Sequence, residues 1–201
     1  TELKRERQLI AEEIASQQDN LAGLAFEQFT ATLYGKHPYR MNVLGTRSSL
    51  VKLKGKDLKA AHQAFMRPEN MVLSVVGDVD REALVEQIKA LFTGRKTEAG
   101  VVQPRPPVIP IEPKQKDQRV AITHRSRQQA HLVLGYQGVR LRSEDRHALE
   151  VLMAVLAGQG WRLFVELRDK RSLAYSVTGF SLEGIEPGFV AIYLGVDPTR
   201  V

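Results

Sequence analysis

Five of the chain's nine prolines fall in one stretch, between Gly94 and Gln118, and this stretch divides the sequence into two parts. Proline fixes one backbone angle and removes an amide donor, so such a segment favours extended, polyproline-like structure with few packing contacts. The sequence therefore predicts two folded parts, residues 1–94 and 119–201, joined by a linker at residues 95–118.

The first part is mainly helical by its pattern. Runs of helix-forming residues with apolar stripes predict four helices, at about residues 2–18, 20–34, 56–66 and 81–92. Asn20 is the expected N-cap of the second helix. The apolar run Met71–Val76 predicts a buried strand.

The second part mixes strands and helices. Alternating or continuous apolar runs predict four strands, at residues 119–124, 130–136, 174–182 and 188–195. Helices are predicted at about 144–157, with Ser143 as cap, and at 161–169. Since the elements lack the regular spacing of βαβ units, we expect an α+β fold.

The last predicted strand has an unusually apolar run, Phe189–Leu194, with no charge in it. An open strand edge of this kind invites pairing with another chain. We therefore expect the isolated chain to form a homodimer or to exchange strands.

Composition restricts the class of protein. A chain of 201 residues with 43% hydrophobic residues can bury a core. No apolar run reaches the roughly 20 residues of a membrane-spanning helix, and the charged N-terminus predicts a helix instead of a signal peptide, so no membrane association is expected. The absence of cysteine excludes thiolate ligands and is compatible with either cytoplasm or periplasm.

The net charge of +6 comes from basic residues scattered along the chain. Most stand among apolar residues at alternating or helical spacing, as on solvated faces, without the clustering typical of nucleic-acid binders. We expect no nucleic-acid partner.

One segment, Leu163 to Tyr175, combines charged, apolar and aromatic residues in a specific order, LFVELRDKRSLAY. It contains Arg168 and, seven positions later, Tyr175. By general rules alone, an arginine at a helix C-terminus and a tyrosine at the start of a strand are ordinary.

The whole segment closely resembles a signature of the insulinase/pitrilysin family of zinc metallopeptidases, in the domain that does not carry the metal. In that family, an arginine and a tyrosine so spaced reach across a cleft toward the substrate. The resemblance implies that Arg168 and Tyr175 bind the substrate's backbone carbonyl and stabilise charge on the tetrahedral intermediate. Trp161 is a departure, because related sequences usually carry a small residue there.

Further segments resemble the family in its own order, from about residue 4 to residue 198. They are His37-Pro38-Tyr39, Val43–Thr46, Arg67–Leu73 and Val76–Val79. The resemblance implies two α+β sandwich domains, each incomplete. Residues 1–94 would be the rear part of the first domain, and residues 119–201 the front part of the second.

Two glutamates of the first predicted helix, Glu6 and Glu13, lie seven residues apart, so both project from one helix face. By pattern alone this is a solvated face, where Lys4, Arg5 and Arg7 would balance the charge. The family has a helix with two glutamates so spaced, of which the distal one is the third zinc ligand. The resemblance thus implies Glu13 as a zinc ligand and Glu6 as a supporting acidic residue of the catalytic site.

The family's other two ligands come from an HxxEH motif, which this sequence lacks. Its five histidines are His37, His62, His124, His131 and His147, and no two are four apart. Because a catalytic zinc needs about three protein ligands, Glu13 alone would not hold it. We expect the chain as given to be inactive and without zinc, and the full-length parent to be a zinc-dependent endopeptidase acting on peptides.

Two other functions stay open. Some family members without HxxEH are partner subunits that lend the arginine and tyrosine to an active peptidase. A basic binding module unrelated to proteolysis is the other alternative, and steep salt-dependent binding of nucleic acid would favour it.

Overall fold

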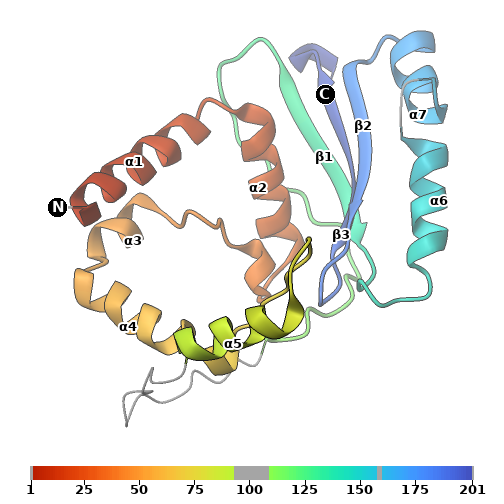
Figure 1. The fold of residues 1–201 in the computed structure, drawn as a ribbon. Coiled ribbons are helices and arrows are strands. Elements are labelled where there is room, and N and C mark those ends of the chain that lie inside the picture. The colour runs from red at the N-terminus through yellow and green to blue at the C-terminus, as the bar shows by residue number, and fades with distance from the viewer. Residues whose placement is uncertain (1, 93–108, 158–159, 201) are drawn as a thin grey trace.

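The computed structural model describes residues 2–92, 109–157 and 160–200. A three-stranded sheet lies between helix α2 (Leu21–Leu33) on one face and helices α6 (Arg146–Leu156) and α7 (Arg162–Phe164) on the other (Figure 1). Helices combined with a small antiparallel sheet confirm the predicted α+β class.

The sheet consists of β1 (Ala130–Gln137), β2 (Ala174–Leu182) and β3 (Phe189–Val196), in the order β1-β3-β2. β3 is therefore central and pairs antiparallel with both neighbours. The prediction that its apolar run forms an open edge is wrong, because β1 and β2 cover both of its sides. The expectation of a homodimer was based on that open edge, so the sheet does not support it.

The four helices predicted in the first part are present: α1 (Glu2–Gln17), α2, α4 (Gly55–Phe65) and α5 (Arg81–Phe92). Asn20 caps α2 as predicted, since its side-chain oxygen accepts a hydrogen bond of 2.9 Å from the Gly23 N–H. A short helix, α3 (Arg47–Lys52), was not predicted. No described helix is both long enough and apolar enough to cross a membrane.

Helix α2 packs on the sheet through aromatic rings. The ring centroids of Phe26 and Phe180 are 5.1 Å apart, and Phe29 meets Phe189 edge-on at 5.3 Å. Tilted and edge-on contacts of this kind are favourable. Gly135 of β1 permits the close approach, because a Cβ there would lie 2.6 Å from the Phe29 ring. A helix from before the proline-rich stretch thus shares a core with strands that come after it.

Helix α6 covers the opposite face. Gly179 of β2 faces the buried Met153, and a Cβ at this glycine would lie 2.9 Å from the methionine methyl group. The helix predicted at about residues 144–157 is confirmed, although it begins at Arg146. Asp145 occupies the N-cap position, so Ser143 is not the cap. The Ser143 hydroxyl instead accepts a hydrogen bond from the Asp145 N–H at 3.3 Å.

Two predicted strands are wrong. Residues 71–76 and 119–124 are not hydrogen-bonded into a sheet, and both are exposed. Val72 and Val76 expose 94% and 99% of their surface. Both segments have the apolar pattern of a strand, but within the described chain no strand lies alongside to pair with them.

The described end of the proline-rich stretch docks on the chain just after α2. Glu112 is buried, and its carboxylate accepts hydrogen bonds from the backbone N–H groups of Gly35, Lys36 and His37 at 2.8, 2.9 and 3.2 Å. Burial raises the pKa of Glu112, but these three hydrogen bonds and the nearby Arg119 outweigh it and lower the pKa below the usual value. The linker at residues 95–118 stays a prediction, since residues 93–108 lie outside the described chain.

Tyr34 and His37 are almost fully buried at this junction, with 1% and 2% of their surface exposed. The Tyr34 hydroxyl donates to the Pro187 carbonyl at 3.1 Å, and burial, Tyr39 and Glu112 raise its pKa to about 12.

Candidate functional site

The segment singled out in the sequence joins α7 to β2 through irregular backbone. The helix continues from Phe164 directly into a π-helical turn, Val165–Lys170. Such turns are rare and recur at functional sites. The helix predicted at residues 161–169 is therefore present, but its widened turn was not predicted. Trp161 precedes it with 49% of its surface exposed.

Arg168 lies in the π-helical turn with an exposed side chain. Its guanidinium carbon is 4.8 Å from the centroid of the Phe164 ring, a cation–π contact that limits its orientation. The nearby Glu166 pairs with Lys170 at 2.6 Å. None of the ion pairs formed within the described residues involves Arg168, so its N–H groups are available to a carbonyl or carboxylate.

Ser172 reverses the chain between the π-helical turn and β2. Its φ of 49° is in the left-handed region that favours glycine. The turn is closed by two backbone hydrogen bonds, from Ser172 to the Arg168 carbonyl at 3.0 Å and from Leu173 to the Leu167 carbonyl at 2.8 Å.

β2 begins with a β-bulge at Tyr175. Ala174 pairs with Val196 and Ser176 pairs with Gly195, so Tyr175 is the extra residue between two paired ones. Bulges re-aim side chains and are common next to active sites. The tyrosine side chain exposes 61% of its surface.

Buried apolar residues anchor this irregular segment to the sheet. Leu163 and Leu167 pack against Ala174, Val177 and Val196. The anchored side chains hold the backbone in place, while Arg168 and Tyr175 extend from it into solvent. The structure therefore brings these two predicted site residues onto one short, supported segment.

Glu6 and Glu13 lie on α1, and both are exposed. The Glu6 carboxylate pairs with Arg5 at 3.1 Å. In Figure 1, α1 lies beyond α2 from the sheet, while α7 lies on the sheet's other face. The structure does not bring the two glutamates together with Arg168 and Tyr175.

Comparison with known proteins decides the family. Residues 52–201 match the family model described as the peptidase M16 inactive domain, and this range includes the whole segment with Arg168 and Tyr175. The chain belongs to the peptidase M16 family. The match confirms the resemblance to insulinase/pitrilysin peptidases.

Relatives of this M16 chain are named as proteases. The uncharacterized zinc protease SCO5738 of Streptomyces coelicolor is 30% identical, over 98% of this chain and 43% of its own length. Zinc protease PqqE of Helicobacter pylori is 33% identical, over 96% of this chain and 44% of its own length. The crystal structure of a protease from Helicobacter pylori is 30% identical, with a TM-score of 0.84 over 98% of this chain and 48% of that one. The M16 chain thus spans less than half the length of these relatives.

Because two of the relatives are named zinc proteases, we asked whether the side chains of the M16 chain could bind a zinc ion. No group of three histidine, aspartate or glutamate side chains suited to a metal ion is present in the described part. A catalytic zinc takes about three protein ligands. Glu13 and its neighbours therefore do not form a zinc site by themselves.

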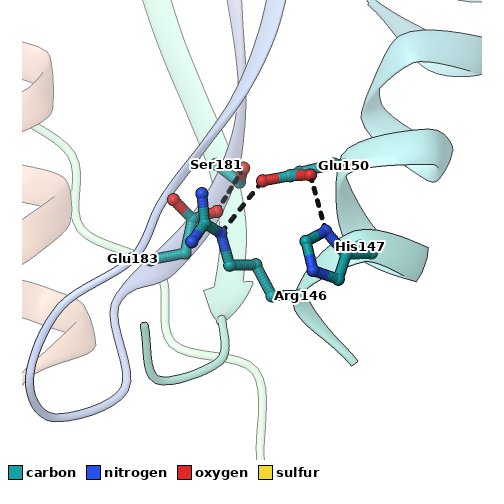
Figure 2. Close-up of polar contacts among 5 residues, drawn as sticks. All are labelled: Arg146, His147, Glu150, Ser181 and Glu183. Carbon is teal, nitrogen blue, oxygen red and sulfur yellow. Dashed lines mark hydrogen bonds and ion pairs between the residues drawn. The ribbon is translucent and has the colours of Figure 1, made fainter. Parts of the chain in front are cut away.

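A second polar cluster, between α6 and the end of β2, does not form a catalytic arrangement (Figure 2). Glu150 accepts hydrogen bonds from His147 at 3.2 Å and from Arg146 at 2.9 Å. Both contacts lower the pKa of Glu150, and the hydrogen bond from His147 has the larger effect. Ser181 donates to Glu183 at 2.8 Å and not to His147. Without a serine–histidine hydrogen bond, the cluster consists of the ion pairs of Glu150 and the separate Ser181–Glu183 hydrogen bond.

Proposed function

We propose that this M16 chain is part of a zinc-dependent endopeptidase, in which Arg168 and Tyr175 bind the backbone of a peptide substrate. One observation carries the proposal: a π-helical turn, a left-handed Ser172 and a β-bulge follow one another within residues 165–176. Each is less favourable than regular backbone and is typically retained where function requires it. The zinc proteases among its relatives support the reaction class.

Arg168 and Tyr175 supply the hydrogen-bond donors that amide cleavage requires. The guanidinium of Arg168 and the hydroxyl of Tyr175 can both donate to the carbonyl oxygen of the bond to be cleaved. Donors aimed at this oxygen bind it more strongly as negative charge develops, which lowers the barrier. Neither side chain needs to transfer a proton for this role.

We propose that Glu13 contributes one zinc ligand and that Glu6 is an acidic residue near the metal. A carboxylate oxygen is an accepted zinc ligand, and both side chains are exposed on α1. The remaining ligands would come from residues outside this chain. This chain alone would then be inactive.

Glu6 and Glu13 lie far from Arg168 and Tyr175 in the fold. This separation favours a second proposal, in which the chain serves as the partner subunit of a peptidase. Within this chain, α2 lies between the sheet and α1, which carries Glu13 (Figure 1), so the chain by itself does not present Glu13 and Tyr175 to the same peptide bond. Arg168 and Tyr175 would then serve a zinc site on another peptidase chain or on a second copy of this one.

Peptide cleavage by the full-length protein that contains this chain tests the proposal. Arg168→Ala and Tyr175→Phe are each expected to lower kcat by about 10²–10³-fold, the usual cost of losing one donor to the developing oxyanion. Tyr136→Phe is the matched control, because Tyr136 on β1 is also exposed, at 79%.

Mixing two inactive variants separates the two arrangements. If Arg168 and Tyr175 act on another copy, a mixture of Glu13→Gln and Tyr175→Phe proteins regains part of the activity that each lacks alone. A mixture that stays inactive would exclude a second copy of the same protein as the partner. Full activity of the Arg168→Ala and Tyr175→Phe proteins would contradict the proposal itself.

A further inference from the structure

The helical segment that carries Arg168 is strongly basic. Four of the ten residues from 162 to 171 are basic and two are acidic. The basic residues are Arg162, Arg168, Lys170 and Arg171, and all four side chains are exposed. The segment therefore adds positive charge to the surface around the residues proposed to bind the substrate.

Only part of this charge is neutralised within the segment. Lys170 pairs with Glu166 at 2.6 Å, which accounts for one basic and one acidic side chain. The three arginines form none of the ion pairs present among the described residues. Of the acidic side chains in residues 162–171, only Asp169 is left to oppose them. The segment thus has an excess of positive charge, all of it on guanidinium groups.

The backbone places the three arginines along one short helix. Arg162 is the first residue of α7, which continues into the π-helical turn that ends at Lys170. Arg171 follows directly, and its N–H donates a hydrogen bond to the Arg168 carbonyl. At about 1.5 Å per residue, Arg162 and Arg171 are roughly 13 Å apart along the helix, the length of about four residues of extended peptide. A peptide whose carbonyl contacts Arg168 therefore passes within a few residues of the other two arginines.

We propose that Arg162 and Arg171 bind acidic side chains of the substrate, so that the preferred substrate is a peptide with aspartate or glutamate within about four residues of the cleaved bond. A guanidinium group binds a carboxylate through two parallel hydrogen bonds and keeps its charge at physiological pH. A neutral peptide lacks this contact, and a basic one is repelled. This inference rests on the proposed function, because it assigns the substrate class of the same site.

Cleavage of three matched peptides by the full-length protein that contains this chain tests the preference. The peptides differ only in the residues that flank the cleaved bond, which are glutamate, glutamine or lysine, and mass spectrometry confirms that the same bond is cut. At low ionic strength, kcat/KM should be about three- to tenfold higher for the glutamate peptide than for the glutamine peptide, the effect of one or two exposed ion pairs. It should be lowest for the lysine peptide, and added salt should reduce the differences because it screens exposed charges.

Charge reversal separates substrate recognition from a structural role. Arg162→Glu and Arg171→Glu should each shift the preference toward the lysine peptide, whereas a variant with a weakened fold would cleave all three peptides more slowly by the same factor. Arg81→Glu is the matched control and should keep the wild-type preference, because Arg81 is an exposed arginine at the start of α5, away from α7 in Figure 1. Equal cleavage of the three peptides by wild type, or an unchanged preference in both variants, would overturn the inference.

Peptide binding in the presence of a chelator distinguishes this inference from the proposed function. Fluorescence anisotropy with labelled forms of the same peptides measures Kd without cleavage, and the glutamate peptide should bind about three- to tenfold more tightly than the glutamine peptide. Binding in this order without cleavage under any condition would refute the endopeptidase and still support the acidic preference. Equal binding, no binding, or tighter binding of a single-stranded oligonucleotide of the same length would overturn the inference.

Discussion

At the scale of single residues, Arg168 and Tyr175 are both exposed and both belong to backbone that departs from regular geometry. Arg168 is in a π-helical turn, and Tyr175 is the extra residue of a bulge. Between them, Ser172 has a φ of 49°. An L-residue in this conformation costs roughly 1–2 kcal/mol, which the surrounding contacts must offset.

Substitution of Ser172 tests this backbone strain. Ser172→Gly should leave the free energy of unfolding unchanged or raise it slightly, because glycine has no Cβ to clash. Ser172→Val should lower it by about 1–2 kcal/mol, because a β-branched residue is poorly tolerated there. Denaturant unfolding measures both, with Ser74→Val as the control at an exposed position outside the helices and strands. Equal stability of the Gly and Val variants would show that the turn stores no strain.

Local chemistry also explains which residues could be identified from the sequence. By general rules, Arg168 and Tyr175 are ordinary, and only the resemblance to a family singled them out. The π-helical turn and the bulge depend on how Leu167 packs and on how β2 aligns with β3. Such long-range contacts are not encoded in the residues nearby, so neither feature could be predicted.

At the scale of secondary structure, helices were more predictable than strands. The helices α1, α2, α4 and α5 follow from periodicity and caps within each segment, such as Asn20. Strands depend on partners distant in sequence. Residues 71–76 and 119–124 have a strand pattern without a partner, and the apolar β3 is central where an edge was expected.

The contact between Glu112 and the end of α2 predicts a pH dependence of stability. The pKa of Glu112 is lowered in the folded protein, so its ionised form stabilises the fold at pH above about 4.5, its ordinary value. This stabilisation is lost as the pH falls through the lowered folded pKa. At neutral pH, Glu112→Gln should cost about 1–3 kcal/mol, since three backbone N–H groups, of Gly35, Lys36 and His37, lose an ionised acceptor.

Denaturant unfolding from pH 7 to pH 3 measures this effect. The difference in unfolding free energy between wild type and Glu112→Gln should shrink on acidification below about pH 4.5. Glu144→Gln, at an exposed glutamate, is the control and should match wild type throughout. A difference that does not change with pH would contradict a stabilising carboxylate at this junction.

At the scale of the whole molecule, the M16 chain has two groups of candidate site residues on opposite sides of its core. α1 carries Glu6 and Glu13, and the segment after α7 carries Arg168 and Tyr175 (Figure 1). The chain also spans less than half the length of its zinc protease relatives, with 43% of SCO5738 covered. Both facts favour a site completed by residues beyond this chain.

Zinc content of the full-length protein tests this account most directly. The wild type and Glu12→Gln, a control at the neighbouring glutamate of the same helix, should each bind about one zinc per chain, and Glu13→Gln should bind little. A chelator should abolish cleavage of an unstructured peptide by the wild type, and added zinc should restore it. Zinc bound equally by Glu13→Gln, or wild type without zinc and without cleavage, would contradict a zinc endopeptidase built on Glu13.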